Sequence, residues 1–448
     1  MNPSGTTALV FRNVEEVIAY HAGEPVACGT FLAQIQAVAD ALPAATATIN
    51  LCEDRYLFMV GFFAAITRGQ YNLLLPSRQP GAVREALEAD PDRCLLHDGK
   101  HGGDTPAAFD IRPVLEERPL DTSVPEIPDH QLSAVVHTSG STGQPQEIRK
   151  YWETLVVGTR INLAHVLGDT QEHHGVVATV PPWHMFGLEY TILLPLLGNT
   201  STYCGSTLFP AEIRAALEKM PDRRILVSTP VHLRAMINSG LTFPPVSRAL
   251  CATSPLSPEL ARAVEKTLAT DLLELYGCSE VGCLAFRRPV KEEHWTFFSK
   301  FQVHRQGSAV TVDADHVPEP VTLADTLEFD DDGRFILRGR DSDLVKIGGK
   351  RGSLAELTNR LLDIEGVDDG VIFHRQPDSD ATEVRLSALV VSPQRTIDEI
   401  RSELTKVIDP VFLPRPIRQV DRLPRNRTGK LRIADLESLF RDTETANE

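Results

Sequence analysis

The run His-Thr-Ser-Gly-Ser-Thr-Gly at residues 137–143 has the composition of a phosphate-binding loop. It follows the apolar stretch 132–136, which predicts a buried strand. Successive backbone N–H groups in such a loop form a concave anion site, and glycines let the backbone approach phosphate oxygens closely. Hydroxyl side chains add hydrogen-bond donors and possible metal ligands: Thr138, Ser139, Ser141 and Thr142. A polar surface turn is the competing interpretation, and the loop is not a Walker A motif because no GxxxxGK pattern occurs.

The segment after this loop lacks the positive charge that would help to hold phosphate. Gln146 and Glu147 follow Pro145, and the first cations are Arg149 and Lys150. Backbone N–H groups and a metal ion would then carry more of the ligand's charge, and either cation is expected to reach back toward the loop.

Composition and charge narrow the class of protein. The chain has 448 residues, a net charge of −16, 42% hydrophobic and 24% charged residues, which predicts a globular protein of two or three domains. The acidic balance argues against a binder of nucleic acid or of an anionic membrane surface. An anionic ligand must therefore be met by local basic groups or by backbone N–H groups.

Cysteine usage and the apolar stretches predict a cytoplasmic location. The seven cysteines are scattered, odd in number and form no CxxC pair, so we expect buried or inert thiols in a reducing compartment. Residues 1–17 have no signal-peptide pattern. The longest apolar stretch, 56–66, is too short to span a bilayer and predicts a buried helix.

Strand-like and helical segments alternate through most of the chain, which predicts an α/β fold with parallel sheets. Strands, each with the start of the loop that follows, are expected at 46–54, 71–76, 93–99, 132–140, 175–182 and 224–230, and helices at 56–67, 81–89, 210–220 and 260–269. Between 298 and 340, short β segments joined by Asp and Gly turns predict a small antiparallel sheet or barrel-like region. The last 108 residues predict a compact α+β unit. We therefore expect a large N-terminal domain, 1–340, and a mobile C-terminal domain, 341–448.

The stretch TSGSTGQP at 138–145 resembles the phosphate-loop signature of the adenylate-forming superfamily, which includes acyl- and aryl-CoA synthetases. Six further segments resemble that family in the same order: PPWHMFG at 181–187, ATSPLSPEL at 252–260, LYGCSEVG at 275–282, LADTLEFDDDG at 323–333, GRDSDLVKIGGKRGSLAEL at 339–357 and LPRNRTGKLR at 423–432. Together they cover roughly residues 130–440. The short region before the phosphate loop looks most like the synthetases of aryl-polyene pigment clusters.

The resemblance implies a two-step reaction that begins with attack of a carboxylate on the α-phosphate of ATP. It implies that Lys430 bridges the carboxylate and α-phosphate oxygens, and that Glu280 and Thr138 bind Mg²⁺. The polyphosphate would lie in the loop formed by Ser139, Gly140, Ser141, Thr142 and Gly143. The alternative without a catalytic role is a solvated surface lysine for Lys430 and a carboxylate at a helix N-terminus for Glu280.

The resemblance also implies a nucleoside site and an acid pocket. Adenine would pack on Tyr276 and Gly277 and against the turn of Thr253 and Ser254, which replace a more usual Gly-Ala. Asp325 and Arg340 would hold the ribose hydroxyls. The acid pocket would be bordered by His184, Met185, Phe186, Gly187 and Cys278. No Asp occurs between Val180 and Leu188 to pair with an amino-acid ammonium, and Glu189 is the nearest acid, so an acid without an α-amino group is expected.

In the second step the acyl group would move to a thiol after rotation of the C-terminal domain. Ser342 stands where the family usually has a charged hinge residue, and the glycines of 346–352 suit a pantetheine tunnel. Residues 415–432 carry seven cations against one acid, Asp421. This segment is either a solvated face paired with local acids or a dock for an acidic acyl-carrier protein or the phosphates of coenzyme A.

The sequence is compatible with three functions. The leading one is an ATP-dependent acid–thiol ligase. The others are a catalytically weak relative that binds nucleotide as an interaction protein, and an adenylation enzyme that stops at acyl-adenylate. Gln146, Leu323-Ala324 and Ser342 depart from the family pattern, whereas Glu280 and Lys430 match it.

Overall fold

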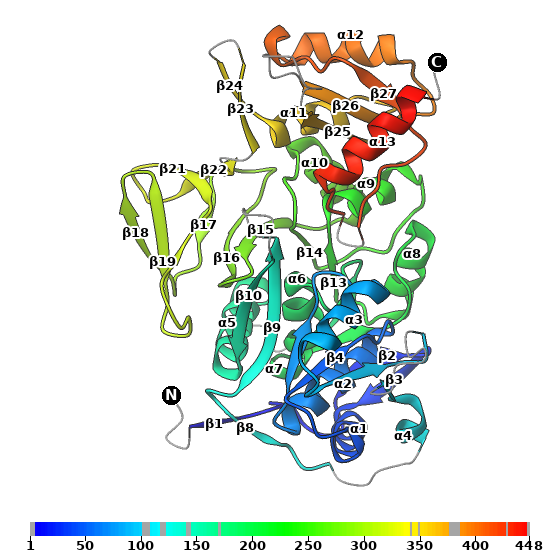
Figure 1. Cartoon of the computed structure of the whole chain (residues 1–448), viewed down its shortest axis with the longest axis vertical. Coiled ribbons are helices and arrows are strands. Elements are labelled where there is room, and N and C mark those ends of the chain that lie inside the picture. The colour runs from blue at the N-terminus through cyan, green and yellow to red at the C-terminus, as the bar shows by residue number, and fades with distance from the viewer. Residues whose placement is uncertain are drawn as a thin grey trace.

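The computed structural model describes residues 5–100, 108–116, 122–139, 145–168, 172–340, 343–347, 350–375, 386–426 and 429–445. The molecule is elongated, and the elements that follow residue 350 lie at one end of its long axis (Figure 1). Parallel sheets flanked by helices make up the body, so the predicted α/β class is confirmed.

The first sheet contains six strands in the order β10-β9-β5-β4-β6-β7. Their bounds are β4 Ala47–Asn50, β5 Tyr71–Leu74, β6 Arg93–His97, β7 Ala108–Asp110, β9 Leu132–Ser139 and β10 Pro145–Tyr151. All neighbours are parallel except β10, which returns antiparallel to β9 from the segment predicted to bind phosphate. The sheet therefore presents the end of β9 at its carboxyl edge.

The apolar stretch 56–66 lies in α2, Arg55–Thr67, as a buried helix. Asp54 caps this helix by accepting a hydrogen bond from the Leu57 backbone N–H at 3.0 Å. Every residue from 58 to 66 is buried, because the helix lies against the first sheet in the largest core cluster. Among the described residues, no helix is long and apolar enough to cross a membrane.

The second sheet contains nine strands in the order β17-β16-β15-β14-β13-β11-β12-β2-β3. Their bounds are β2 Val17–His21, β3 Glu24–Ala27, β11 His174–Ala178, β12 Thr200–Tyr203, β13 Arg224–Ser228, β14 Arg248–Cys251, β15 Leu272–Cys278, β16 Gly282–Arg287 and β17 Thr296–Phe297. The six central strands are parallel, and β3, β16 and β17 are antiparallel additions at the two sides. The chain therefore leaves β11, β13, β14 and β15 at one common edge, where ligands bind in open α/β sheets.

The remaining elements of the body connect and cover these sheets. Its helices are α1 Cys28–Ala41, α3 Pro80–Ala89, α4 Arg112–Glu116, α5 Trp152–Val166, α6 Met185–Gly187, the π-helix Leu188–Leu193, α7 Leu194–Leu197, α8 Pro210–Lys219, α9 Pro230–Asn238 and α10 Pro258–Leu268. A short pair of strands, β1 Thr6–Ala8 and β8 Glu126–Pro128, lies outside the two large sheets.

The predicted antiparallel region contains two short sheets that share one apolar cluster. The first has the order β18-β19-β20, and the second is the pair β21-β22. Their bounds are β18 Gln302–Gln306, β19 Ala309–Asp313, β20 Val321–Thr322, β21 Asp325–Phe329 and β22 Phe335–Arg340. Phe335 is fully buried and packs on Tyr276, Trp295 and Phe297, so this region rests on the β15–β16 side of the second sheet.

The C-terminal elements agree with the predicted α+β order and add a hairpin that the sequence interpretation missed. The hairpin pairs β23, Leu344–Ile347, with β24, Lys350–Ser353. It is followed by α11 Leu354–Leu362, β25 Asp369–His374, β26 Leu386–Val391, α12 Ile397–Val407, the 3₁₀ turn Pro410–Phe412, β27 Ile417–Gln419 and α13 Ile433–Thr445. Two glycines between short alternating segments are a hairpin signal, but the sequence interpretation connected these glycines only with a pantetheine tunnel.

Candidate active site

A cleft separates the carboxyl edge of the second sheet from the C-terminal elements. Its walls include three groups of predicted site residues: His184, Met185 and Phe186; Thr253 and Ser254; and Tyr276, Gly277, Cys278 and Glu280. Asp325 and Lys430 also line it. The structure thus brings together residues that lie up to about 250 positions apart, from 184 to 430.

The predicted phosphate loop begins at the end of β9. Gly140, Ser141, Thr142 and Gly143 lie outside the described residues, and for Thr138 and Ser139 only the backbone is described. That backbone pairs Thr138 with Gln146 and Ser139 with Pro145. Gln146 is exposed and lines the cleft.

Lys150 does not reach back toward the phosphate loop, so that expectation was wrong. Its side chain is 1% exposed, and its Nζ donates a hydrogen bond to the backbone oxygen of Glu280 at 2.7 Å. Burial lowers the pKa of Lys150. The lysine therefore joins β10 to the turn between β15 and β16 from behind the cleft. Arg149 is exposed and remains near the surface.

The turn that carries Glu280 is tight. A Cβ atom at Gly277 would collide with the backbone oxygen of Gly282, so position 277 requires glycine. Cys278 is partly buried, and burial raises its pKa to about 12, which leaves no thiolate for nucleophilic attack. Glu280 is a partly exposed carboxylate that lines the cleft. Cys278 also lines the cleft.

Tyr276 and Asp325 are directly joined. The Tyr276 hydroxyl donates a hydrogen bond to Asp325 Oδ2 at 2.8 Å. Its ring packs edge-on against Trp295 and Phe335. Asp325 stands opposite Arg340 in the β21–β22 register, although only the backbone of Arg340 is described.

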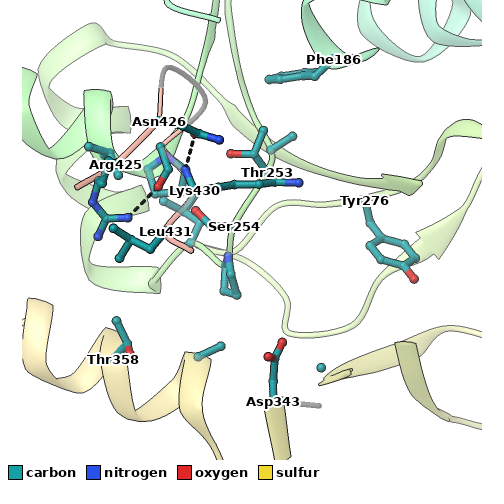
Figure 2. A pocket seen from close by; sticks show the side chains of 18 of the residues that line it. Phe186, Thr253, Ser254, Tyr276, Asp343, Thr358, Arg425, Asn426, Lys430 and Leu431 are labelled. Atoms are coloured by element: carbon teal, nitrogen blue, oxygen red, sulfur yellow. Dashed lines mark hydrogen bonds between the residues drawn. The ribbon is translucent and has the colours of Figure 1, made fainter. Parts of the chain in front are cut away.

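The turn after β14 holds an unusual backbone conformation. Thr253 has φ of +84°, a region that favours glycine and is strained for a β-branched residue. This explains why the resembled family more usually has Gly there. Thr253 and Ser254 lie beside Lys430 in Figure 2.

Lys430 lies on a turn that polar contacts hold in place. The Asn426 backbone N–H donates to the Lys430 oxygen, and the Lys430 N–H donates to Asn426 Oδ1, both at 2.9 Å (Figure 2). Arg425 donates to the Gly429 oxygen at 2.7 Å and forms a two-point ion pair with Asp369, with both contacts at 2.7 Å. Sequence reasoning missed Arg425, Asn426 and Asp369 in this role, because Asp369 lies on β25, 56 positions before Arg425.

His184 lies within the electrostatic reach of Lys430. Burial and, secondarily, the Lys430 charge lower the pKa of His184 to about 4. Its Nδ1 is buried and has no hydrogen-bond partner among the described residues. The imidazole is therefore neutral near pH 7 and borders the cleft as an uncharged group.

The segment after His184 packs tightly. A Cβ atom at Gly187 would collide with the Pro181 backbone oxygen, so glycine is required. Met185 packs on the largest core cluster, Phe186 is buried and packs edge-on against Tyr190, and both residues line the cleft. Glu189 also lines the cleft, although sequence reasoning had mentioned it only as the nearest acid.

The basic segment 415–432 is not a continuous cationic face. Arg418 donates to the Phe440 oxygen and the Thr443 hydroxyl and lies over the Phe440 ring. Arg425 is paired with Asp369, and Lys430 lines the cleft. The exposed arginines described in this segment are Arg415, Arg422 and Arg432. The predicted pairing with local groups therefore holds for part of the segment.

A family model described as AMP-binding enzyme matches residues 42–304. The chain belongs to the AMP-binding enzyme family. The predicted resemblance to adenylate-forming enzymes is confirmed, and with it the general function of an ATP-using ligase that activates a carboxylic acid.

The individual relatives of this AMP-binding enzyme share less than a third of their aligned residues with it. A 4-coumarate–CoA ligase of Halorhodospira halophila is 27% identical over 313 residues, covering 67% of this chain and 75% of the relative. A 3,4-dihydroxybenzoate–aryl-carrier-protein ligase of Bacillus anthracis is 21% identical over 308 residues, covering 67% and 72%.

Solved structures show the same fold at low sequence identity. The anthranilate CoA ligase AuaEII, in complex with anthranoyl-AMP, matches with a TM-score of 0.80 and 15% identity over 100% of both chains. The o-succinylbenzoate CoA synthetase of Bacillus subtilis, in complex with ATP and magnesium ion, matches with a TM-score of 0.77 and 15% identity, covering 93% of this chain and 95% of the other.

Proposed function

We propose that this AMP-binding enzyme is an acid–thiol ligase that converts a carboxylic acid and ATP to acyl-adenylate and pyrophosphate, then transfers the acyl group to a phosphopantetheine thiol. The observation that carries this proposal is the position of Lys430. A turn built by Arg425 and Asn426 holds the lysine in the cleft beside Thr253 and Ser254.

In the first step a carboxylate oxygen forms a bond to the α-phosphorus as the bond from that phosphorus to pyrophosphate breaks. Both reactants are anionic, so the step requires neutralisation of charge and alignment more than proton transfer. Lys430 supplies a cation where negative charge accumulates. The neutral His184 lies within reach of that cation and does not compete for its anionic partners.

We assign the polyphosphate to the loop after β9, with Ser139, Gly140, Ser141, Thr142 and Gly143 as its cradle. The partly exposed carboxylate of Glu280 fits Mg²⁺, which prefers oxygen ligands shared with phosphate, and Thr138 is the second proposed ligand. When bound, Mg²⁺ neutralises part of the polyphosphate charge. The Lys150 side chain donates a hydrogen bond to the backbone oxygen of Glu280. This contact fixes the position of the Glu280 backbone, from which the carboxylate side chain extends.

We assign the nucleoside to the side of the cleft where Tyr276 and Asp325 meet. Adenine would lie against Tyr276, Gly277 and the Thr253–Ser254 turn. Asp325 and Arg340 would hold the ribose hydroxyls, since their backbones are paired across β21 and β22. The Tyr276 hydroxyl orients the Asp325 carboxylate by donating to one of its oxygens.

The proposed acid pocket is bordered by His184, Met185, Phe186, Gly187 and Cys278. An aryl acid is supported by two relatives, ligases of 4-coumarate and of 3,4-dihydroxybenzoate, and by a structurally similar ligase of anthranilate, because all three acids are aromatic. The acceptor is either coenzyme A or an acyl-carrier protein, and the exposed Arg415, Arg422 and Arg432 offer cations to the phosphates or acids of either.

We further propose that residues 1–340 and 341–448 are two domains that change their relative position between the two steps. Among the described residues, no apolar core cluster spans this division, and the contacts across it include polar ones. Arg234 Nη1 donates to the Leu362 oxygen at 2.7 Å, and the Ser257 hydroxyl donates to Asp363 Oδ1 at 2.9 Å. Such contacts can exchange with water, so withdrawal of Lys430 does not require the loss of a large apolar interface.

ATP–pyrophosphate exchange over a panel of aryl and fatty acids tests the first step. Exchange with at least one acid is expected; nucleotide binding without exchange for any acid would favour the catalytically weak alternative. Transfer of the acyl group to coenzyme A and to holo-carrier protein, read by mass spectrometry, tests the second step. Exchange without transfer to either thiol would identify an enzyme that stops at acyl-adenylate.

A further inference from the structure

Glu189 is a buried carboxyl group in the wall of the cleft. It is 6% exposed and lines the cleft together with Phe186, Cys278 and Cys283. Acidic side chains are almost never buried to this degree unless they are paired. Its segment, Leu188–Leu193, is a π-helix, a form that occurs frequently at functional sites.

The local backbone is shaped to admit this carboxyl group. Gly282 opens β16 with φ of +96°, and a Cβ atom there would collide with Glu189 Oε1. The backbone N–H of Cys283 favours the charged form of the carboxyl group and opposes the rise of its pKa. Because residue 282 has no side chain, the Glu189 side chain can occupy this space. The Glu189 carboxyl group therefore lies directly behind the turn that carries Glu280.

The charge of Glu189 is only partly compensated. Burial raises its pKa to about 7, and attraction to Lys150 opposes that rise. No ion pair joins Glu189 to a cation within the described part of the chain, and Lys150 donates instead to the Glu280 backbone oxygen. Asn162 lies beside Glu189, fully buried, and neither polar atom of its amide makes a hydrogen bond of normal geometry. Such a buried carboxyl group retains capacity to accept a hydrogen bond from a ligand.

We infer that Glu189 determines the specificity of the acid pocket by accepting a hydrogen bond from a hydroxyl or N–H group on the acid substrate, distal to its carboxylate. The inference rests on the proposed function, which directs the substrate carboxylate to Lys430. His184 is within reach of the Lys430 charge, and Glu189 follows five positions later along the same wall. The preferred substrates are therefore aryl acids that carry a hydroxyl or amino group on the ring or its tail.

The reason for discrimination is the cost of an unsatisfied buried acceptor. A substrate acid without the hydroxyl or N–H group would displace water from the Glu189 carboxyl group without supplying a hydrogen bond in its place. Sites that hydrogen-bond a substrate hydroxyl reject the analogue without it far more strongly than apolar pockets reject a missing methylene. We expect a preference of at least about 10-fold in kcat/KM for the donor-bearing acid of a matched pair.

The test uses pairs of acids that differ by one group: benzoate with 4-hydroxybenzoate and 4-aminobenzoate, and cinnamate with 4-hydroxycinnamate. Wild type should favour the donor-bearing member in ATP–pyrophosphate exchange. Glu189→Gln, which keeps the shape and one acceptor, should reduce the preference, and Glu189→Leu should abolish or reverse it. Glu24→Gln, on the exposed strand β3, is the matched control and should leave the preference unchanged.

Binding of the matching acyl-sulfamoyl adenosines by calorimetry separates this inference from the proposed function. These compounds resemble the acyl-adenylates and bind without reacting. A preference for the hydroxylated analogue that falls in Glu189→Gln and disappears in Glu189→Leu would support the role of Glu189 even if no acid supported exchange. An unchanged ratio in both Glu189 variants, with melting temperatures close to wild type, or a wild-type preference for the unsubstituted acids, would overturn the inference.

Discussion

Lys150 and Lys430 lie in opposite environments: Lys150 is buried behind the cleft, whereas Lys430 lines it. Lys150 comes from β10 of the first sheet, is 1% exposed, and reaches the Glu280 turn through the core. Lys430 comes from the C-terminal elements, is exposed, and depends on the polar contacts of Arg425 and Asn426. The lysine that we propose leaves the site between the two steps is thus held by contacts that water can replace. A lysine that shapes the pocket is enclosed by packing.

The largest effect is expected for Lys430→Ala. Adenylation should fall by about 10²–10³-fold, because the variant removes the cation at the reacting oxygens. Thiol transfer from supplied acyl-adenylate should be nearly unchanged, since Lys430 is withdrawn in that step. Parallel assays of exchange and of acyl transfer measure both. Lys300→Ala, at an exposed lysine, is the control; equal losses in both steps for Lys430→Ala would contradict the proposed domain rotation.

Lys150→Met should instead reduce the stability of the fold. The Glu280 backbone oxygen loses its donor, and buried Glu189 loses a compensating charge. We expect a loss on the order of 3 kcal/mol in the free energy of unfolding, measured by denaturant titration. Lys430→Ala should stay within about 0.5 kcal/mol of wild type, as is usual at exposed positions.

The double variant Lys150→Met/Glu189→Gln checks this reason. It leaves no unpaired buried charge, so it should recover part of the lost stability. If Lys150→Met alone lowers the free energy of unfolding by less than about 1 kcal/mol, burial does not make Lys150 more important for stability than Lys430.

The contrast also shows what the sequence could predict. Lys430 and Tyr276 stand in recognisable motifs, so their presence in one cleft was expected before any geometry was known. The alternation of strands and helices likewise predicted the α/β class, because buried parallel strands are short apolar runs between helical patterns. The seven motif segments span both the body and the C-terminal elements, and the cleft is built from the same parts of the chain.

Lys150, Glu189 and Asp369 were not predictable in the same way. Their roles depend on which strands become neighbours and which side chains turn inward. Lys150 contacts a residue 130 positions away, and Asp369 contacts one 56 positions away. No local period encodes such pairings. The direction of Lys150 was misjudged because nearness in sequence to the phosphate loop suggested nearness in space.

The charge of Lys430 should be detectable at His184 through the pH dependence of stability. The pKa of His184 is lowered to about 4, so the unfolded state binds more protons than the folded state between about pH 4 and 6.5. Stability therefore falls as pH is lowered through that window. Relative to His184→Gln, wild type should lose on the order of 2 kcal/mol between pH 7 and pH 4. Thermal or denaturant unfolding at several pH values measures this difference.

Lys430→Ala should weaken that dependence slightly, because the Lys430 charge is the second cause of the shift after burial. Matching pH profiles for wild type and His184→Gln would show that His184 titrates normally. An unaltered wild-type profile in Lys430→Ala would place Lys430 too far from His184 to act on it.

Asp369→Asn should affect catalysis through the position of Lys430. The variant keeps the shape of the side chain but weakens the two-point pair that anchors Arg425. A misplaced Lys430 should lower the kcat of adenylation by about 10-fold while the KM values for ATP and acid change little. In the Lys430→Ala background, Asp369→Asn should add almost nothing. A full additional loss there would assign Asp369 a role unrelated to Lys430.

The smallest expected effect comes from adding a lysine at the edge of the cleft, at position 146. Gln146 is exposed, lines the cleft and pairs in register with Thr138, at the end of the strand that enters the proposed phosphate loop. Gln146→Lys should lower the KM for ATP by roughly 3-fold at low salt without changing kcat, since it adds attraction to the polyphosphate and touches no reacting atom. Gln146→Met, of similar size and uncharged, is the control, and high salt should reduce the gain. Because Lys150 is turned into the core and Arg149 lies at the surface, no other described cation of β10 can mask the result. An unchanged or raised KM would mean that the polyphosphate does not lie at this end of β9 and β10.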